Sequence, residues 1–433
     1  MDKLKIHGGN QLNGKIFISG AKNAALPLIC ASLLTEEKVT LTNMPMLSDI
    51  KAMNALLDFL GAEIKEMDDF VDGHATKTYA YITKQVSGFT APYDYVRKMR
   101  ASYYVLGPLL ARYGRCELSL PGGCAIGARP MDIHLSSMEQ MGAKIEIKNG
   151  YINADVDGRL HGAHIIFPIV SVGATCNVMM AAVLAEGETI LENAAKEPEI
   201  GDLANLLNDM GAKIEGIGTS KLTITGVEKL HGALHKVIAD RIEAGSYAAA
   251  AAITRGRIEL INAIPETLSR PLQVLRNMGV EVETTDNSII IDARGKTLVG
   301  QDIMTEPFPG FPTDLQAQFL ALMMTCEGAS MVTETIFENR FMHVPELLRM
   351  GANINVHGHA SAIVRGVKKL SGAPVMATDL RASFALVLAG LVAEGETIVN
   401  RVYHLDRGYE KLEEKLRGVG ADIERIKESD EGE

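Results

Sequence analysis

The sequence repeats a short signature six times, and this repetition limits the possible architectures more than any single motif does. The six copies are LGAEI, MGAKI, MGAKI, MGVEV, MGANI and VGADI. Their glycines are separated by 68 to 81 residues and stand at Gly61, Gly142, Gly211, Gly279, Gly351 and Gly420. Units of this size are too large for a simple solenoid, so we expect two domains of three units each.

Each signature follows a stretch with helical periodicity. In MDIHLSSMEQ, for example, Met131, Leu135 and Met138 fall on one helix face. The glycine then predicts a helix C-cap, and the alternating residues after it, such as KIEIK or NINVH, predict a strand.

A second helix, rich in small residues, precedes each signature and runs into a sequence such as AEGETI. Helices rich in alanine and glycine can pack closely, so we expect them to be buried. Each unit is therefore predicted to run helix, strand, loop, helix, strand, with further short strands such as HGAHIIF between units. The third unit ends near TITGVEKLHGALHKVIAD, which predicts a domain boundary around residues 234–239.

Composition excludes several classes of partner. The 433-residue chain has a formal net charge of −11, which disfavours binding to nucleic acid or to an anionic membrane. Neither a signal peptide nor a run of about 18 apolar residues is found.

Five cysteines without a C-x-x-C pair favour a reducing cytoplasm. The pairs His161/His164 and His357/His359 lack further ligands at metal-binding spacing. We expect a cytoplasmic protein without a metal.

One segment places a thiol among glycines and next to an arginine. It is PGGCAIGARP, residues 121–130. It is not a phosphate-binding P-loop, because Ala128 and Arg129 replace the required lysine and hydroxyl residue. The glycines let backbone N–H groups approach an anion, and nearby cations favour the thiolate form of Cys124. The pattern predicts a reactive thiol beside a bound anion.

Other candidate anion-binding groups have simpler alternatives. Lys22 and Asn23 stand where a helix is predicted to begin. Either Lys22 is a cation that binds an anion beside the free N–H groups of the helix start, or it is an ordinary exposed lysine next to a capping Asn23. Asp314 in FPTDLQAQF also precedes a predicted helix, so the alternative to a site residue is an N-cap of that helix. Arginines in different repeats could grip phosphate or carboxylate, or form surface ion pairs. They are Arg100, Arg129, Arg340, Arg381 and Arg407.

Several segments together resemble one known family. They are ISGAKNAALPL, PGGCAIGARP, FPTDLQAQF, FENRFMHVPEL, TDLRAS and HLDRGYEKL. They are similar to the UDP-N-acetylglucosamine 1-carboxyvinyltransferases, over the whole chain apart from the acidic tail. The resemblance implies an α/β fold of two inside-out barrels with three repeats each. It places residues 22–238 in the first domain and residues 1–21 plus 239–433 in the second, with the active site in the cleft between them.

The resemblance also implies the reaction and its residues. The family transfers the enolpyruvyl group of phosphoenolpyruvate to the 3′-hydroxyl of UDP-N-acetylglucosamine, the first committed step of peptidoglycan synthesis. No cofactor and no obligate protein partner is implied. The implied catalytic residues are Cys124 on a lid, Asp314 and Lys22. Those implied for phosphoenolpyruvate are Lys22, Asn23, Arg129, Arg340, Arg381 and Arg407. Those implied for the UDP-sugar are Asn23, Arg100, Arg129, Pro130, Asp132, Ile133, Ser171, Val172, Gly173, Asp314 and Ile336. Asp379 is a further candidate, and Glu338 is expected to be structural.

Two rival functions stay open. A shikimate-pathway enolpyruvyl transferase shares the fold, but it lacks the cysteine segment and normally has P-G-S-K-S where this chain has S-G-A-K-N. A non-catalytic UDP-sugar-binding regulator is disfavoured by the joint presence of Cys124, Asp314 and Lys22. Met46, Ser48 and Ile169 stand where other members often have lysine, which is compatible with a second, paralogous copy.

Overall fold

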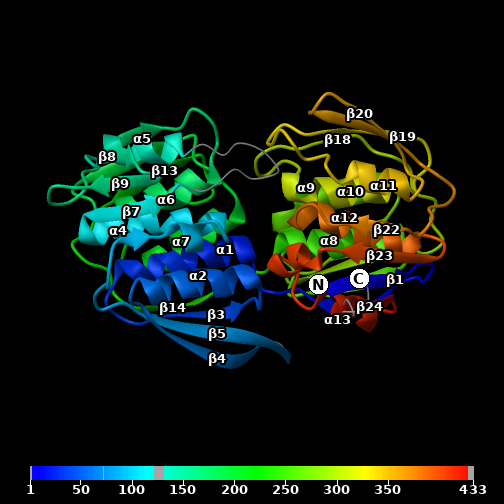
Figure 1. Cartoon of the computed structure of the whole chain (residues 1–433), viewed down its shortest axis with the longest axis horizontal. Helices are drawn as coiled ribbons and strands as arrows, with labels where there is room; N and C mark the ends of the chain where they lie inside the picture. Colours follow the sequence, from blue (N-terminus) through cyan, green and yellow to red (C-terminus); the bar gives the residue numbers. More distant parts are fainter. Residues whose placement is uncertain (1, 72, 121–130, 428–433) are drawn as a thin grey trace. The chain divides into compact units, whose positions relative to one another are not determined.

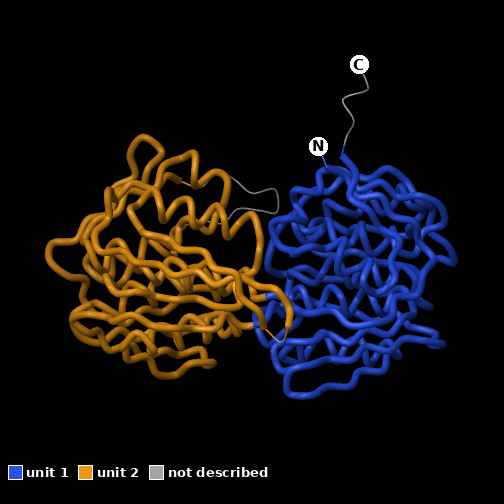
Figure 2. Tube along the Cα trace, turned by 90° about the horizontal axis from the view of Figure 1, so that it is seen from below, with its two compact units in different colours: residues 1–19, 124–128, 239–433 blue, residues 20–123, 129–238 orange. Residues whose placement is uncertain are grey.

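The computed structural model describes residues 2–71, 73–120 and 131–427, which form two compact units (Figure 2). Unit 1 contains residues 2–19 and 239–427, and unit 2 contains residues 20–120 and 131–238. The chain therefore leaves unit 1 after Ser19 and returns to it after Ile238. None of the described helices is long and apolar enough to cross a membrane.

Each unit contains three four-stranded sheets, and all six sheets share one topology. The first strand runs parallel to the second, and the other pairs are antiparallel. The sheets of unit 2 are β14(Ala233–Lys236)-β3(Val39–Met44)-β5(His74–Ile82)-β4(Glu63–Val71), β6(Thr90–Ala91)-β7(Arg115–Ser119)-β9(Tyr151–Asp155)-β8(Lys144–Lys148) and β10(His164–Ile166)-β11(Glu188–Glu192)-β13(Lys221–Thr225)-β12(Lys213–Glu215). Those of unit 1 are β2(Asn13–Phe17)-β15(Arg257–Ile261)-β17(Ser288–Asp292)-β16(Glu281–Thr284), β18(Ile303–Met304)-β19(Ala329–Thr333)-β21(Ser361–Arg365)-β20(Asn353–His357) and β22(Pro374–Met376)-β23(Glu396–Asn400)-β1(Asp2–His7)-β24(Asp422–Lys427).

In four of the six sheets, three strands of one repeat pair with a strand that ends the preceding repeat, counted around the unit. In unit 2, β14 ends the third repeat and pairs with β3 of the first, so the three repeats close on themselves. In unit 1 the N-terminal strands close the circle instead. β1 completes the sheet of the sixth repeat, and β2 pairs with β15 of the fourth. This pairing explains why the N-terminal residues fold with the C-terminal half of the chain.

The helices rich in small residues are buried on all sides, as predicted, and lie inside each unit (Figure 1). All thirteen residues of α8 and all eight of α10 are buried. In contrast, strands such as β19 and β13 alternate between buried and exposed residues, which is typical of sheets with one solvated face. The helices inside and the sheets outside make each unit the expected inside-out α/β barrel. The inner helices are α1(Lys22–Ala31), α4(Leu106–Tyr113), α6(Val172–Ala182), α8(Arg241–Ile253), α10(Gln316–Met323) and α12(Leu380–Val392).

The remaining helices connect strands or extend the inner helices. The α-helices are α2(Ser48–Phe59), α3(Tyr93–Val96), α5(Asp132–Gln140), α7(Pro198–Asp209), α9(Ser269–Asn277), α11(Val344–Arg349) and α13(Leu412–Gly418). The 3-10 helices are η1(Ser32–Leu34), η2(Arg100–Val105), η3(Pro265–Leu268), η4(Thr313–Leu315) and η5(Val402–Arg407).

The six signature glycines end helices, as the repeat predicts. All six have φ between 90° and 103°. Each glycine N–H donates to the carbonyl three residues earlier, and the next residue donates to the carbonyl five residues earlier. This is the Schellman arrangement, in which glycine adopts the left-handed conformation without the steric cost of a Cβ.

The end of α13 offers a test of this requirement. Gly420 has φ +103°, whereas Gly418, two residues earlier, has room for a Cβ and no left-handed backbone. We expect Gly420→Ala to lower the free energy of unfolding by about 1–2 kcal/mol. Gly418→Ala should leave it unchanged or raise it by up to about 1 kcal/mol, because alanine favours the helix. Urea denaturation of both variants measures the difference, and equal effects would contradict the assignment.

Candidate active site

A partly exposed carboxylate held by two buried arginines forms the centre of the candidate site in unit 1. Asp314 lies in η4, and its Oδ1 accepts a hydrogen bond from Arg340 Nη2 at 2.9 Å. Its Oδ2 accepts one from Arg381 Nε at 3.2 Å. The two arginines are only 6% and 3% exposed, so the alternative of surface ion pairs is wrong for both. The structure thus joins residues that are 26 and 67 positions apart in sequence.

The N-cap alternative for Asp314 is also wrong. In the other two repeats of unit 1, Asp240 and Asp379 cap α8 and α12, each accepting N–H groups two and three residues later. Before α10, the chain inserts the short helix η4, capped by Pro312, and Asp314 lies within it. The carboxylate therefore faces guanidinium groups, while the cap at Asp379 fixes the first turn of α12 and with it Arg381.

Glu334 organises the loop beside this cluster and was missed by the sequence reasoning. Its buried Oε1 accepts hydrogen bonds from Thr305 Oγ1 and from the backbone N–H groups of Ile336 and Phe337, at 2.8–3.1 Å. Its Oε2 accepts one from Thr313 Oγ1 at 2.9 Å. Glu334 thereby ties the Ile336 loop to the residue next to Asp314.

The surroundings of two histidines show where the other predicted groups of unit 1 lie. Burial lowers the pKa of His343 to about 4; Asp379 opposes this shift and Arg340 adds to it. His343 is therefore neutral at pH 7 and adds no positive charge beside Arg340. Burial and the charge of Arg407 lower the pKa of His404, and Asp379 opposes them. Arg407, at the end of η5, thus lies in the same region as Asp379.

In unit 2, Lys22 is a buried cation with a carboxylate partner. It begins α1 as predicted, and its Nζ lies 3.3 Å from Asp49 Oδ2. The two side chains are 9% and 6% exposed, so the alternative of an ordinary exposed lysine is wrong. Asn23 follows in the same turn and is partly exposed. Asp49, in the first turn of α2, was not predicted.

Three further segments predicted to bind the UDP-sugar meet at His134: its own helix α5, the segment of Arg100 and the start of α6. His134 is buried beside Tyr103, and its Nδ1 lies 3.0 Å from Asn177 Nδ2. Burial, and to a lesser extent the charge of Arg100, lowers its pKa to about 4. A Cβ on Gly173 would lie 3.1 Å from His134 Cε1 and 2.6 Å from the Tyr103 hydroxyl, so only glycine fits there. Arg100 and Gly173 therefore lie near the same histidine.

The remaining predicted residues of unit 2 also lie at helix starts. Ser171 caps α6 through its side chain, Val172 begins that helix, and Asp132 and Ile133 begin α5. Helix starts carry N–H groups and partial positive charge, which suits a diphosphate. Cys124, Arg129 and Pro130 lie outside the described residues.

The comparisons with known proteins cover nearly the whole chain. The model of the EPSP synthase (3-phosphoshikimate 1-carboxyvinyltransferase) family matches residues 6–416. The UDP-N-acetylglucosamine 1-carboxyvinyltransferase of Paramagnetospirillum magneticum is 61% identical over 99% of both chains. That of Granulibacter bethesdensis is 61% identical over 98% of this chain and 100% of its own. The chain belongs to the UDP-N-acetylglucosamine 1-carboxyvinyltransferase family.

This membership confirms the expected family and makes the chain a transferase. Solved structures of enolpyruvyl transferases agree with it. The enolpyruvyl transferase NikO from Streptomyces tendae is 25% identical, with a TM-score of 0.85 over 98% of both chains. An EPSP synthase from Acinetobacter baumannii, 19% identical with a TM-score of 0.74 over 99% of this chain and 100% of its own, shares the fold.

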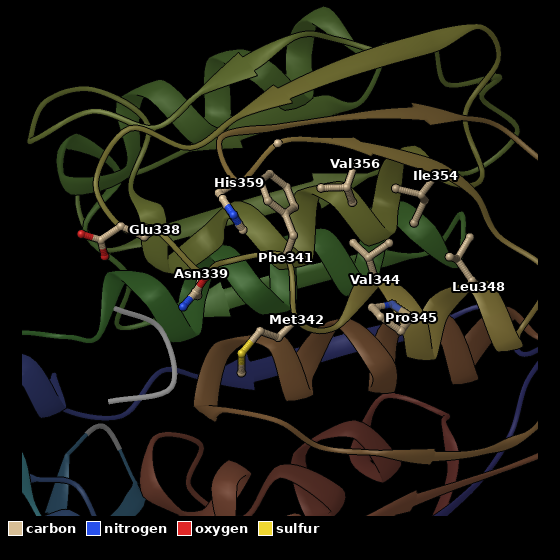
Figure 3. Close-up of a pocket in the computed structure, with 11 residues that line it drawn as sticks. Glu338, Asn339, Phe341, Met342, Val344, Pro345, Leu348, Ile354, Val356 and His359 are labelled. Carbon is tan, nitrogen blue, oxygen red and sulfur yellow. The ribbon is translucent and has the colours of Figure 1, made fainter. Parts of the chain in front are cut away.

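A cavity of about 390 Å³ lies in unit 1 between α11 and β20 (Figure 3). Its walls are largely apolar, with Val344, Leu348, Ile354 and Val356 on one side and Glu338 at the other end. None of the residues predicted for substrate binding lines it. In the described part of the chain, no group of three or more His, Cys, Asp or Glu side chains could hold a metal ion.

The contacts of Glu334 generate a prediction. Glu334→Ala leaves four donors without their buried acceptor, and we expect it to lower the free energy of unfolding by about 3 kcal/mol. Glu334→Gln is the matched control. Its carbonyl oxygen still serves the three donors at Oε1, so the loss should be about 1 kcal/mol. Urea denaturation separates the two, and equal losses would rule out the acceptor role.

Proposed function

We propose that this chain transfers the enolpyruvyl group of phosphoenolpyruvate to the 3′-hydroxyl of UDP-N-acetylglucosamine and releases inorganic phosphate. The observation that carries the proposal is the full-length identity of 54–61% to proteins that bear the name of this activity. The Asp314–Arg340–Arg381 cluster supports it, because it supplies the groups that this chemistry needs.

The reaction needs an acid, a base and cations. The methylene carbon of phosphoenolpyruvate gains a proton while C2 becomes electron-poor and is attacked by the sugar hydroxyl. The resulting tetrahedral adduct then loses phosphate and a methyl proton, which restores the double bond. Asp314 orients the hydroxyl and takes its proton. Arg340 and Arg381 bind the carboxylate of phosphoenolpyruvate beside it, because a guanidinium pairs well with a carboxylate.

Cations from several repeats bind the phosphate groups. Lys22 binds the phosphate of phosphoenolpyruvate, and Asp49 holds the lysine at the start of α1. Arg129 and Arg407 complete this phosphate site. Arg100 and the N-terminal turn of α6, from Ser171 to Gly173, bind the nucleotide diphosphate, and Asp132 and Ile133 contact the base.

Cys124 supplies the proton for the methylene carbon. A thiol beside arginine and lysine ionises readily, so it can also form a covalent adduct with phosphoenolpyruvate and react with the epoxide fosfomycin. We place the reaction in the cytoplasm, in peptidoglycan synthesis and hence in cell division, with no partner beyond its two substrates.

Phosphate release tests the acceptor. Phosphoenolpyruvate with UDP-N-acetylglucosamine should give turnover, and shikimate 3-phosphate should give none, because the comparisons favour the first acceptor by name. Asp314→Asn should lower kcat by about 100-fold or more by removing the base. Turnover with shikimate 3-phosphate alone would reverse the assignment, and absence of turnover with both would favour the non-catalytic regulator.

Thiol labelling tests the reactive cysteine. The four described cysteines are buried, and burial raises the pKa of Cys176 to about 12 and of Cys326 to about 11. It raises the pKa of Cys30 and Cys116 as well. At pH 7 we therefore expect iodoacetamide to label Cys124 first, as measured by peptide mass spectrometry. Labelling of Cys124 no faster than Cys30 or Cys326 would remove the activated thiol from the mechanism.

A further inference from the structure

A second layer of buried polar side chains lies directly behind Asp314 and Arg381. Gln318, on α10, is fully buried, and its Nε2 donates to the backbone carbonyl of Asp314 at 2.9 Å. The same amide contacts the Ser246 hydroxyl and the Tyr409 hydroxyl, each at 3.0 Å. Ser246 belongs to α8 and Tyr409 follows η5, so the layer joins all three repeats of unit 1.

The hydrogen bonds in this layer have a fixed direction. Ser246 Oγ donates to the backbone carbonyl of Ile242 at 2.7 Å, so its only proton is already used. The Tyr409 hydroxyl, 2.9 Å from Ser246 Oγ, must therefore donate to it. The lone pairs of the Tyr409 oxygen are then left to accept hydrogen bonds from other groups, Gln318 among them.

Arg381 lies against this tyrosine. Its guanidinium carbon is 5.7 Å from the centre of the Tyr409 ring. Burial raises the pKa of the Tyr409 phenol and the nearby guanidinium opposes this shift, so the two groups interact electrostatically. Arg381 itself is 3% exposed and binds Asp314 through Nε. The tyrosine thus lies against the arginine that holds the carboxylate, and its phenol is electrostatically coupled to the guanidinium.

We propose that Tyr409, Gln318 and Ser246 are positioning residues for the reaction. Ser246 orients the Tyr409 hydroxyl, Tyr409 fixes the guanidinium of Arg381, and Gln318 fixes the backbone of Asp314. The inference rests on the proposed roles of Asp314 and Arg381. None of the three residues touches a reacting atom, so they act through the arginine and the carboxylate.

The core of unit 1 contains a matched control for the tyrosine. Tyr247 is the neighbour of Ser246 on α8 and is fully buried, and its hydroxyl has no hydrogen-bond partner in the described part of the chain. Tyr247→Phe and Tyr409→Phe therefore each remove one buried hydroxyl and keep the ring. Only the second removes a group from the layer behind Arg381.

The experiment measures steady-state kinetics of phosphate release for both variants, with thermal unfolding to show that each is folded. We expect Tyr409→Phe to lower kcat/KM for phosphoenolpyruvate by about tenfold, because Arg381 loses the polar oxygen beside it and Gln318 loses a hydrogen-bond partner. The KM for UDP-N-acetylglucosamine should stay within about twofold, and Tyr247→Phe should match the wild type in both. An unchanged kcat/KM in Tyr409→Phe, or equal losses in both variants, would overturn the proposal.

Ser246→Ala provides a second test that a folding defect in Tyr409→Phe cannot obscure. It should lower kcat/KM for phosphoenolpyruvate by about threefold, because the tyrosine loses its fixed orientation. The double variant should resemble Tyr409→Phe, since serine acts through the tyrosine. Multiplied losses in the double variant, or no loss in Ser246→Ala, would overturn the proposal. If Asp314→Asn is inactive but the layer variants are unaffected, the positioning role alone is refuted. If Asp314→Asn is active, the proposed role of Asp314 in the reaction is refuted.

Discussion

The exchange of one strand between successive repeats is the constraint on which the rest of the structure depends. Each repeat needs at least one strand from elsewhere in the chain to complete its four-stranded sheet, either from the repeat before it or from the N-terminus. The parallel pairs β14–β3 and β2–β15 close the two circles. Only closed circles of sheets can surround helices that are apolar on every side, because an open edge would expose such helices and unpaired strands to water. Closure therefore decides which residues share a core.

The same closure brings the chemistry together. The inner helices of a unit run through its interior, and many of the predicted site residues stand at their first turns or at the short helices before them. Lys22 begins α1, Ser171 caps α6, and Arg381 lies in the first turn of α12. Residues from repeats about 70 positions apart thus meet at one end of each unit, as Asp314 and Arg381 do. Repetition of a stable unit supplies the framework, and departures from the repeat, such as η4, supply the functional groups.

Much of the fold followed from the sequence because its determinants are local. A glycine in a left-handed C-cap and an apolar helix rich in alanine are visible within ten residues. The first five repeats nevertheless each contain one strand more than predicted, such as β9. Its signal was local too, since Asn149 and Gly150, both at positive φ, join β8 to β9 in a two-residue hairpin turn. The partners Asp49 for Lys22 and Glu334 for Thr313 could not be predicted, because such pairs depend on tertiary packing. Asp314 resembled an N-cap for the same reason: its arginines come from other parts of the chain.

The placement of β1 and β2 has a consequence for synthesis on the ribosome. Unit 2 contains all of its own strands once residue 238 has emerged, and it can close at that point. The first nineteen residues belong to unit 1, and β1 pairs with β24, which ends at Lys427. At about 5–20 residues per second, the roughly 190 residues that follow residue 238 take roughly 10–40 s to emerge. During that interval β1 waits for β23 and β24 while attached to a finished domain, where chaperones or neighbouring nascent chains can reach its unpaired edges.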